Sequence, residues 1–207
     1  PYIYTPGALI ARRSPIGRAS RWERAQISAV AVGLLAATGM RVGELLALDA
    51  DEVDLDAGII TVSRGKSRDP RLVPVHATTA ATLTEYAARR ADRTAQSAAF
   101  FIDHRGRRLS RCNTQYAFER TREAAGLTAG GARPRMHDLR HTFAVTTLLG
   151  WYREGADVAG LLPRLSTYLG HSNPANTYWY LTAVPELLAH AARMLNIAQQ
   201  TTREART

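Results

Sequence analysis

A histidine and an arginine three residues apart, His137 and Arg140, are the first candidates for chemistry on a phosphate. On a helix, positions three apart lie on one face, so the imidazole and the guanidinium would stand side by side. A guanidinium binds a phosphate through a fork of donors, and a neighbouring imidazole can accept or donate a proton. The motif is short and occurs by chance in many basic proteins. His141 follows it and is interpreted as a residue that packs or orients the same helix.

Arg41 and Glu44 form a second candidate pair, directly after the helix break Thr38-Gly39. Glu44 lies three positions further on and can reach back to hold the guanidinium of Arg41 in one orientation. An arginine held in this way is suited to binding an anion. The alternative is an ordinary surface salt bridge at the start of a helix, which contributes little to stability.

A third segment, Tyr168 to Tyr180, joins a Leu-Gly-His turn to a short aromatic helix. His171 precedes Tyr180 by nine residues, so both side chains can face one pocket. A turn histidine beside packing aromatics is the alternative. Tyr178 is a rival for Tyr180, but two positions on a helix differ by about 200°, so only one of them can face a phosphate. The spacing from His171 favours Tyr180, and Tyr178 and Trp179 are interpreted as packing residues.

Lysine occurs once among the 27 basic residues, at Lys66, and the other 26 are arginine. Arginine stays protonated at any ordinary pH, whereas a lysine can be tuned to give up its proton. Lys66 lies in a polar loop between two short β-branched runs, residues 58–62 and 71–75, which predict a β-hairpin. We interpret it as a candidate proton donor, the alternative being a lysine retained by chance.

The elements that must position these residues are mainly helices. The fold class predicted is mainly α with a small antiparallel β-sheet (α+β), and a further short strand is expected at residues 100–102. Ser110 is a candidate N-cap. Helices are expected over residues 21–37, 42–48, 78–90, 110–125, 137–150, 156–169, 175–182 and 185–200.

Length and composition set the class of protein. The chain has 207 residues, 45% apolar and 22% charged, which excludes disorder, collagen and a disulfide-stapled miniprotein. Its net charge of +9 favours a polyanionic partner, with nucleic acid first and a membrane surface second. A single cysteine fits a reducing compartment, and no apolar run approaches the ~18 residues that span a bilayer. We expect a soluble, cytoplasmic protein that is not bound to a membrane.

Taken together, these segments resemble the catalytic domain of a tyrosine recombinase of the phage-integrase family, over about residues 21–200. Five features of the family coincide with this sequence in the same order: Thr-Gly-x-Arg-x-x-Glu, the hairpin lysine before Arg-Leu-Val-Pro-Val, His-x-Leu-Arg-His, Leu-Gly-His, and a tyrosine nine residues beyond. The resemblance implies active-site roles for Arg41, Lys66, His137, Arg140, His171 and Tyr180.

The resemblance also implies the reaction, which is site-specific DNA recombination or integration. Attack on DNA makes a 3′-phosphotyrosyl link and frees a 5′ hydroxyl, which then attacks the corresponding link on a partner strand. Two fixed arginines, Arg41 and Arg140, oppose the charge that grows on the phosphate oxygens.

The remaining groups would move protons or fix geometry. Tyr180 must lose a proton, for which His137 is the expected acceptor, although the identity of the base stays open. Lys66 would protonate the departing 5′ oxygen, and His171 would donate a hydrogen bond to the phosphate. No cofactor and no metal are expected, because the sequence has no Walker loop and no clustered metal ligands.

The expected organisation is a basic linker segment at residues 1–20, a catalytic domain at 21–200 and a tail at 201–207. The N-terminal core-binding domain of full recombinases is not supplied by this chain, so we expect weak DNA binding and poor choice of site. The loop at residues 64–71 also lacks the second glycine often seen after the lysine, which leaves the reach of Lys66 open.

The expected partner is double-stranded DNA, bound by a homotetramer when the protein is full length and by a monomer as this fragment. The helix at about residues 185–199 either passes to a neighbouring protomer or packs on its own domain. Two alternative functions stay open: a type IB topoisomerase, which relaxes supercoils with the same chemistry, and a non-catalytic DNA-binding module.

Overall fold

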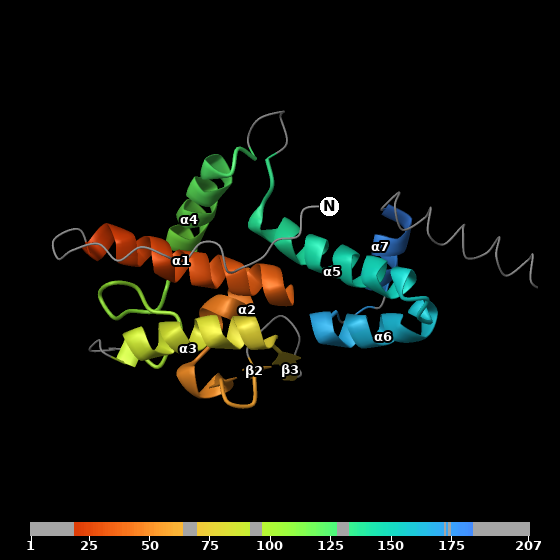
Figure 1. Ribbon diagram of the computed structural model, residues 1–207, viewed down its shortest axis with the longest axis horizontal. Helices are drawn as coiled ribbons and strands as arrows, with labels where there is room; N and C mark the ends of the chain where they lie inside the picture. The colour runs from red at the N-terminus through yellow and green to blue at the C-terminus, as the bar shows by residue number, and fades with distance from the viewer. Residues whose placement is uncertain are drawn as a thin grey trace, which may run out of the picture. The chain divides into compact units, whose positions relative to one another are not determined.

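The computed structural model describes residues 19–63, 70–91, 97–127, 133–171, 173 and 175–183 (Figure 1). The chain divides into two compact units, Pro1–Arg140 and His141–Thr207. Three expected features lie outside the described residues: the linker before residue 19, the hairpin loop that holds Lys66, and the helix and tail from residue 184 onward. Among the described residues, no helix combines the length and apolar character needed to cross a membrane.

The first unit begins with helix α1 (Ala19–Thr38), whose inner face buries Leu34 and Leu35. The helix ends where Gly39 adopts a φ of +63°, a left-handed conformation that glycine accepts at little steric cost. The short helix α2 (Val42–Ala47) follows at once. The break between them therefore places Arg41 at a fixed helix start, as the sequence predicts.

The sheet has three antiparallel strands in the order β1 (Val53–Asp54), β2 (Ile59–Val62) and β3 (Arg71–Pro74). The hairpin of β2 and β3 is the predicted one, and β1 adds a two-residue edge. Ile60 pairs with Val73, and both are buried, so one face of the hairpin belongs to the core. Val62 pairs with Arg71, which places the arginine directly after the loop that contains Lys66.

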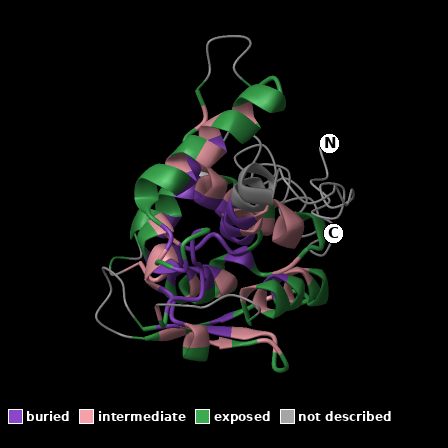
Figure 2. Cartoon of the chain, turned by 90° about the vertical axis from the view of Figure 1, so that its left-hand side faces the viewer, coloured by how far each residue is buried: buried purple, intermediate pink, exposed green. Residues whose placement is uncertain are grey.

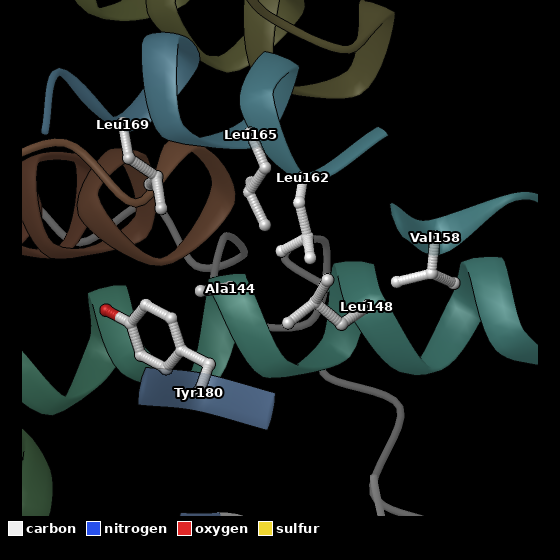
Figure 3. Close-up of a cluster of buried hydrophobic side chains, with 7 residues drawn as sticks. All are labelled: Ala144, Leu148, Val158, Leu162, Leu165, Leu169 and Tyr180. Carbon is white, nitrogen blue, oxygen red and sulfur yellow. The ribbon is translucent and has the colours of Figure 1, made fainter. Parts of the chain in front are cut away.

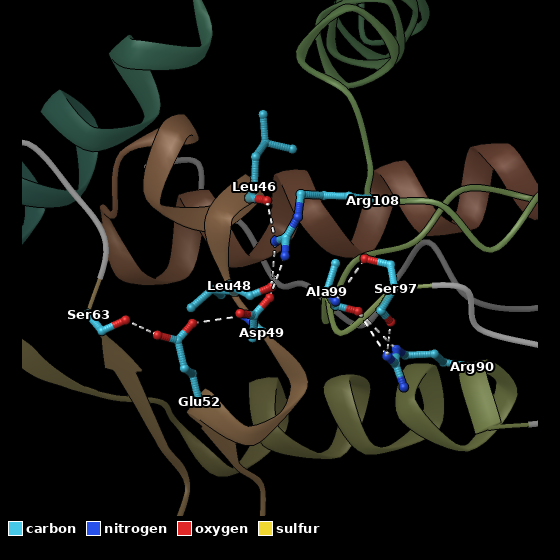
Figure 4. Close-up of polar contacts among 9 residues, drawn as sticks. All are labelled: Leu46, Leu48, Asp49, Glu52, Ser63, Arg90, Ser97, Ala99 and Arg108. Atoms are coloured by element: carbon cyan, nitrogen blue, oxygen red, sulfur yellow. Dashed lines mark hydrogen bonds and ion pairs between the residues drawn. The ribbon is translucent and has the colours of Figure 1, made fainter.

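The segment after helix α3 (Ala77–Ala91) differs from expectation, because residues 100–102 do not form a strand of the sheet. They are buried, and Ile102 makes an isolated bridge with Arg108. Figure 4 shows how separate polar contacts anchor this region: Arg108 donates to the carbonyl oxygens of Leu46 and Leu48 at 3.0 and 3.1 Å and pairs with Asp49. Separate hydrogen bonds to the end of α2 thus hold this segment in place of the regular backbone hydrogen bonds of a strand.

Helix α4 (Arg111–Ala124) starts at the predicted cap, since Ser110 Oγ accepts the backbone N–H of Asn113 at 3.2 Å. It packs against α1 and completes the first unit. Figure 2 shows that helices carry buried stretches on one side and exposed residues on another, as expected for amphipathic helices around a core.

The second unit contains most of helix α5 (Met136–Arg153), with α6 (Val158–Leu169) and α7 (Ala175–Ala183). Asp157 caps α6 by accepting the backbone N–H of Gly160 at 3.1 Å. Figure 3 shows the core of this unit, in which side chains of all three helices meet. Its buried members are Ala144, Leu148, Val158, Leu162, Leu165, Leu169 and Tyr180.

Candidate functional site

Glu44 is the centre of a charge cluster in the first unit. Its carboxylate is 2% exposed and accepts the backbone N–H and Nη1 of Arg41, each at 2.8 Å. Arg71 approaches the same carboxylate with a two-pronged contact, Nη1 to Oε1 at 3.0 Å and Nη2 to Oε2 at 2.7 Å. The Arg41–Glu44 contact is therefore buried on the carboxylate side, unlike an ordinary surface salt bridge.

The electrostatics of this cluster favour the ionised carboxylate. Burial by itself would raise the pKa of Glu44, but hydrogen bonds from the Arg71 side chain and the Arg41 backbone, with the charge of Arg71, hold the pKa below its ordinary value. Two guanidiniums then face one carboxylate, so the three side chains carry one positive charge in excess. A cluster of Arg41 and Glu44 alone would be neutral.

Arg140 lies on the first turns of α5 and belongs to the first unit. It is 2% exposed, and its Nη1 donates to the carbonyl oxygen of Gly39 at 2.8 Å. Arg41 follows Gly39 by two residues, so residues about a hundred positions apart attach to the same break between α1 and α2. His137 is on the same helix, three positions before Arg140, and is exposed.

Tyr180 is the tyrosine of α7 that is buried, with 3% of its side chain exposed. Its hydroxyl lies 3.0 Å from Nδ1 of His141 on α5. Tyr178 and Trp179 are 50% and 56% exposed, so neither belongs to the buried core, although the ring of Trp179 packs against those of His141 and Tyr180. The inner face of α7 is taken by Thr177 and Tyr180, three positions apart, which turns the two intervening aromatics outward.

His171 follows the left-handed cap of α6, where Gly170 has a φ of +66°. Its backbone N–H donates to the carbonyl oxygen of Ser166 at 3.0 Å, and its Nδ1 lies 2.8 Å from Oγ1 of the buried Thr177. The imidazole is thereby held with its ring 6.5 Å from the ring of Tyr180, centroid to centroid, at an angle of 21°. His171 and Tyr180 therefore face each other, as their spacing suggested.

Sequence reasoning missed two side chains of these clusters, Arg71 and His141. Arg71 was seen only as the start of a strand, and nothing local marks it as a partner of Glu44. The sequence interpretation gives His141 a packing or orienting role, although a titratable ring next to a candidate arginine is a signal that the residue could take part in the chemistry.

The described groups can therefore bind an anion and hold an ionisable hydroxyl. The arginines supply forked donors, and the second unit brings a phenol within hydrogen-bond distance of an imidazole. Among the residues that the structure describes, no group of three or more His, Cys, Asp or Glu side chains is placed to hold a metal ion.

Comparison with known proteins gives an independent view of the chain. Residues 20–186 match the phage integrase family. The integrase/recombinase y4rE of Sinorhizobium fredii is 48% identical over 166 residues, which are 79% of this chain and 53% of that protein. Tyrosine recombinase XerA of Thermococcus kodakarensis is 33% identical over 170 residues, 81% of this chain and 55% of that protein. The chain thus spans about half the length of these curated relatives.

Solved structures show the same fold. A crystal structure of XerA recombinase has a TM-score of 0.67 at 26% identity, over 92% of this chain and 66% of that one. XerH recombinase bound to its palindromic difH substrate has a TM-score of 0.64 at 21% identity, over 89% of this chain and 48% of that one. The second likeness, at this low identity, concerns the fold alone.

Proposed function

Because this chain belongs to the phage integrase family, we propose that it is the catalytic part of a site-specific DNA recombinase that cuts and rejoins strands through a 3′-phosphotyrosyl link on Tyr180. The observation that carries the proposal is the tyrosine itself: its side chain is buried where α5, α6 and α7 meet, and its hydroxyl is hydrogen-bonded to the partly buried imidazole of His141. A phenol is a weak nucleophile until its proton is removed, and such a partner is what it needs.

Arg41 and Arg140 are proposed to bind the phosphate that Tyr180 attacks. Negative charge grows on the nonbridging oxygens as the nucleophile enters, and guanidiniums already held in place stabilise that charge without reorganising. The contacts of Arg41 with Glu44 and of Arg140 with the Gly39 carbonyl support this role, because they limit the motion of both side chains. The positive charge that Arg71 adds to the cluster acts in the same direction.

The other predicted residues take the roles that the family resemblance implies. His171 is proposed to donate a hydrogen bond to the phosphate, and its Thr177 contact supports a fixed ring. His137 lies on the same helix as Arg140. Its imidazole is proposed either to donate a hydrogen bond to the phosphate or to transfer a proton. The bond energy stays in the phosphotyrosyl link, so rejoining needs no added energy source.

Double-stranded DNA is the proposed partner, since the chain belongs to the phage integrase family and carries a net charge of +9. Assembly of the longer protein as a tetramer on DNA is part of the proposal. The C-terminal helix expected to be exchanged between protomers lies outside the described residues.

The proposal is tested with duplexes of randomised sequence in which one phosphate carries a 5′-bridging sulfur. Cleavage releases a thiol that does not rejoin, so a covalent protein–DNA adduct accumulates and survives denaturant. We expect an adduct from the wild-type chain and from Tyr178→Phe, and none from Tyr180→Phe, with the labelled tyrosine mapped by mass spectrometry. An adduct that persists in Tyr180→Phe, or no adduct from the wild-type chain, contradicts the proposal.

The DNA sequences recovered from the adduct identify a cleavage site, which can then be used to distinguish recombination from relaxation of supercoils. Two copies are placed in a supercoiled plasmid and treated with the protein. Exchange between the copies supports a recombinase, whereas relaxation of a plasmid with a single copy and no exchange would identify a type IB topoisomerase activity. Binding without any strand cleavage would identify a non-catalytic DNA-binding module.

Lys66, which lies outside the described residues, is proposed as the donor of the proton to the departing 5′ oxygen. Lys66→Ala is expected to slow cleavage of an ordinary phosphodiester by on the order of 10²-fold. A 5′-bridging sulfur should restore the rate, because a thiolate leaves without a proton. Cleavage rates on the two substrates measure this, and an equal defect on both would exclude the role.

A further inference from the structure

The contact between His141 and Tyr180 concerns the one atom of the chain that the proposed reaction requires as a nucleophile. The distance from Nδ1 to the phenolic oxygen is 3.0 Å, within the normal range for a hydrogen bond. An imidazole whose proton is on Nε2 has an unprotonated Nδ1, which then accepts the phenolic O–H. In that tautomer the phenol is the donor and the imidazole the acceptor, which is the arrangement that a proton transfer needs.

Packing fixes both members of this pair. The ring of Tyr180 belongs to the buried cluster of the second unit, where Ala144 of α5 lies beside it (Figure 3). His141 is one helical turn before Ala144, and its ring lies 5.5 Å from that of Tyr180 and 5.8 Å from that of Trp179, centroid to centroid. The imidazole therefore contacts two aromatic rings of α7, which hold it beside the phenol.

We propose that His141 is the proton acceptor for Tyr180, an inference that rests on the proposed function. The O–H bond of Tyr180 breaks and its proton passes to Nδ1 of His141 as the phenolic oxygen forms its bond to phosphorus. The bond from phosphorus to the 5′ oxygen breaks, and that oxygen takes a proton from a separate donor. In rejoining, the 5′ hydroxyl returns its proton to that separate donor as it attacks phosphorus, the bond from phosphorus to Tyr180 breaks, and the imidazolium returns its proton to the phenol.

This assignment differs from the expectation that His137 accepts the proton. The observation behind it is that Nδ1 of His141 lies 3.0 Å from the phenolic oxygen. A phenolate inside an apolar cluster is costly when it is isolated, but proton transfer to His141 creates the imidazolium beside it. The two histidines are four positions, or one turn, apart on the same helix. The same substitution at each of them therefore gives a controlled comparison.

The experiment compares two replacements of His141 on the sulfur-bridged duplexes, where the leaving group needs no proton and nucleophile activation is isolated. His141→Gln keeps an oxygen that can accept the phenolic hydrogen bond but cannot take the proton. His141→Phe removes both properties. Each is combined with the natural Tyr180 and with a difluorinated tyrosine at position 180, whose phenol is more acidic and therefore needs a base less.

We expect His141→Gln to slow adduct formation by on the order of 10²-fold with the natural phenol, and the defect to shrink at least about tenfold with the fluorinated one. His137→Gln should show no such dependence on the acidity of the phenol. His104→Gln, an exposed histidine of the first unit, is the matched control and should match the wild-type rate. Circular dichroism and thermal unfolding establish that each variant is folded.

Several outcomes would overturn the inference. If His141→Gln cleaves as fast as the wild type, the imidazole is not the base. If it is slow with both phenols to the same degree, its role is to position the ring. If the relief by fluorination occurs in His137→Gln instead, the proton goes to that histidine. Absence of any adduct from the wild-type chain would instead remove the proposed function itself.

Discussion

A carboxylate shared by two guanidiniums is the main electrostatic feature of the first unit. Glu44 makes Arg41 part of a cluster whose charge is positive because Arg71 is present. Such groups are costly to bury without partners, so each depends on the others. The same principle applies to Arg140, whose buried guanidinium is partnered by a backbone carbonyl.

Replacing Glu44 should therefore cost stability in a way that depends on pH. Glu44→Gln removes the charge between two arginines and is expected to lower the free energy of unfolding by about 3 kcal/mol at neutral pH. The pKa of Glu44 is below its ordinary 4.5 in the folded protein. The ionised carboxylate thus stabilises the fold above about pH 4.5, and this contribution is lost as the pH falls through the folded pKa.

Urea unfolding of wild type and Glu44→Gln across this pH range measures the effect. The difference in the free energy of unfolding between wild type and Glu44→Gln should be constant above about pH 4.5 and should become smaller below it. Glu85→Gln, at an exposed carboxylate of α3, is the control and should change the stability by less than about 0.5 kcal/mol. A difference for Glu44→Gln that stays the same in acid would contradict the pKa direction.

At the scale of elements, β3 is tied to the start of α2 through Arg71 and Glu44. A double-mutant cycle with Arg71→Met and Glu44→Gln should give a coupling of about 0.5–3 kcal/mol, because the contact is two-pronged and buried. The exposed pair Glu85 and Arg89 on α3 offers the matched cycle, expected to give less than about 0.5 kcal/mol. Equal couplings in the two cycles would show that burial adds nothing here.

The end of α6 depends on a left-handed glycine. Gly170→Ala places a side chain at a φ of +66° and should lower the free energy of unfolding by about 1 kcal/mol. Gly33, inside α1, has open space where a Cβ would lie, and Gly33→Ala should raise stability by about 0.5–1 kcal/mol. Chemical denaturation of both variants tests the contrast; the same sign in both would refute the conformational explanation.

At the scale of the whole molecule, the charge is uneven. Residues 1–140 hold 22 basic and 14 acidic side chains, a surplus of eight, whereas residues 141–207 hold five and four. The first unit also carries the charge cluster of Arg41 and Arg71. Attraction to a DNA backbone is therefore expected to come mainly from the first unit, and the second to supply the nucleophile.

The affinity for duplex DNA should fall steeply as salt is added. Each phosphate neutralised by an arginine releases a counterion, so a surface contacting about six phosphates loses on the order of 10³-fold between about 50 and 200 mM salt. Fluorescence anisotropy with a labelled duplex across this range gives the slope. A flat dependence would mean that the surplus charge does not meet the DNA backbone.

Local patterns were sufficient for most of the architecture. The helices, the hairpin and the cap at Ser110 follow from periodicity, turn residues and capping groups, all of which act within a few positions. The segment at residues 100–102 departs from its strand-like composition because a backbone partner, the carbonyl of Leu48, comes from elsewhere in the fold. Its apolar composition is visible in the sequence, whereas its pairing is decided by the tertiary structure.

The candidate residues could also be chosen from their types and spacing, but their partners could not. Arg71 and Glu44 are 27 positions apart, and His141 and Tyr180 are 39 apart. Whether such side chains meet depends on which faces of α2, β3, α5 and α7 are buried together, and that balance of packing and desolvation is settled over whole elements. No short stretch of residues contains the information on that balance. For this reason the contact of His141 with the phenol could not be predicted from the sequence, which indicated only a packing or orienting role.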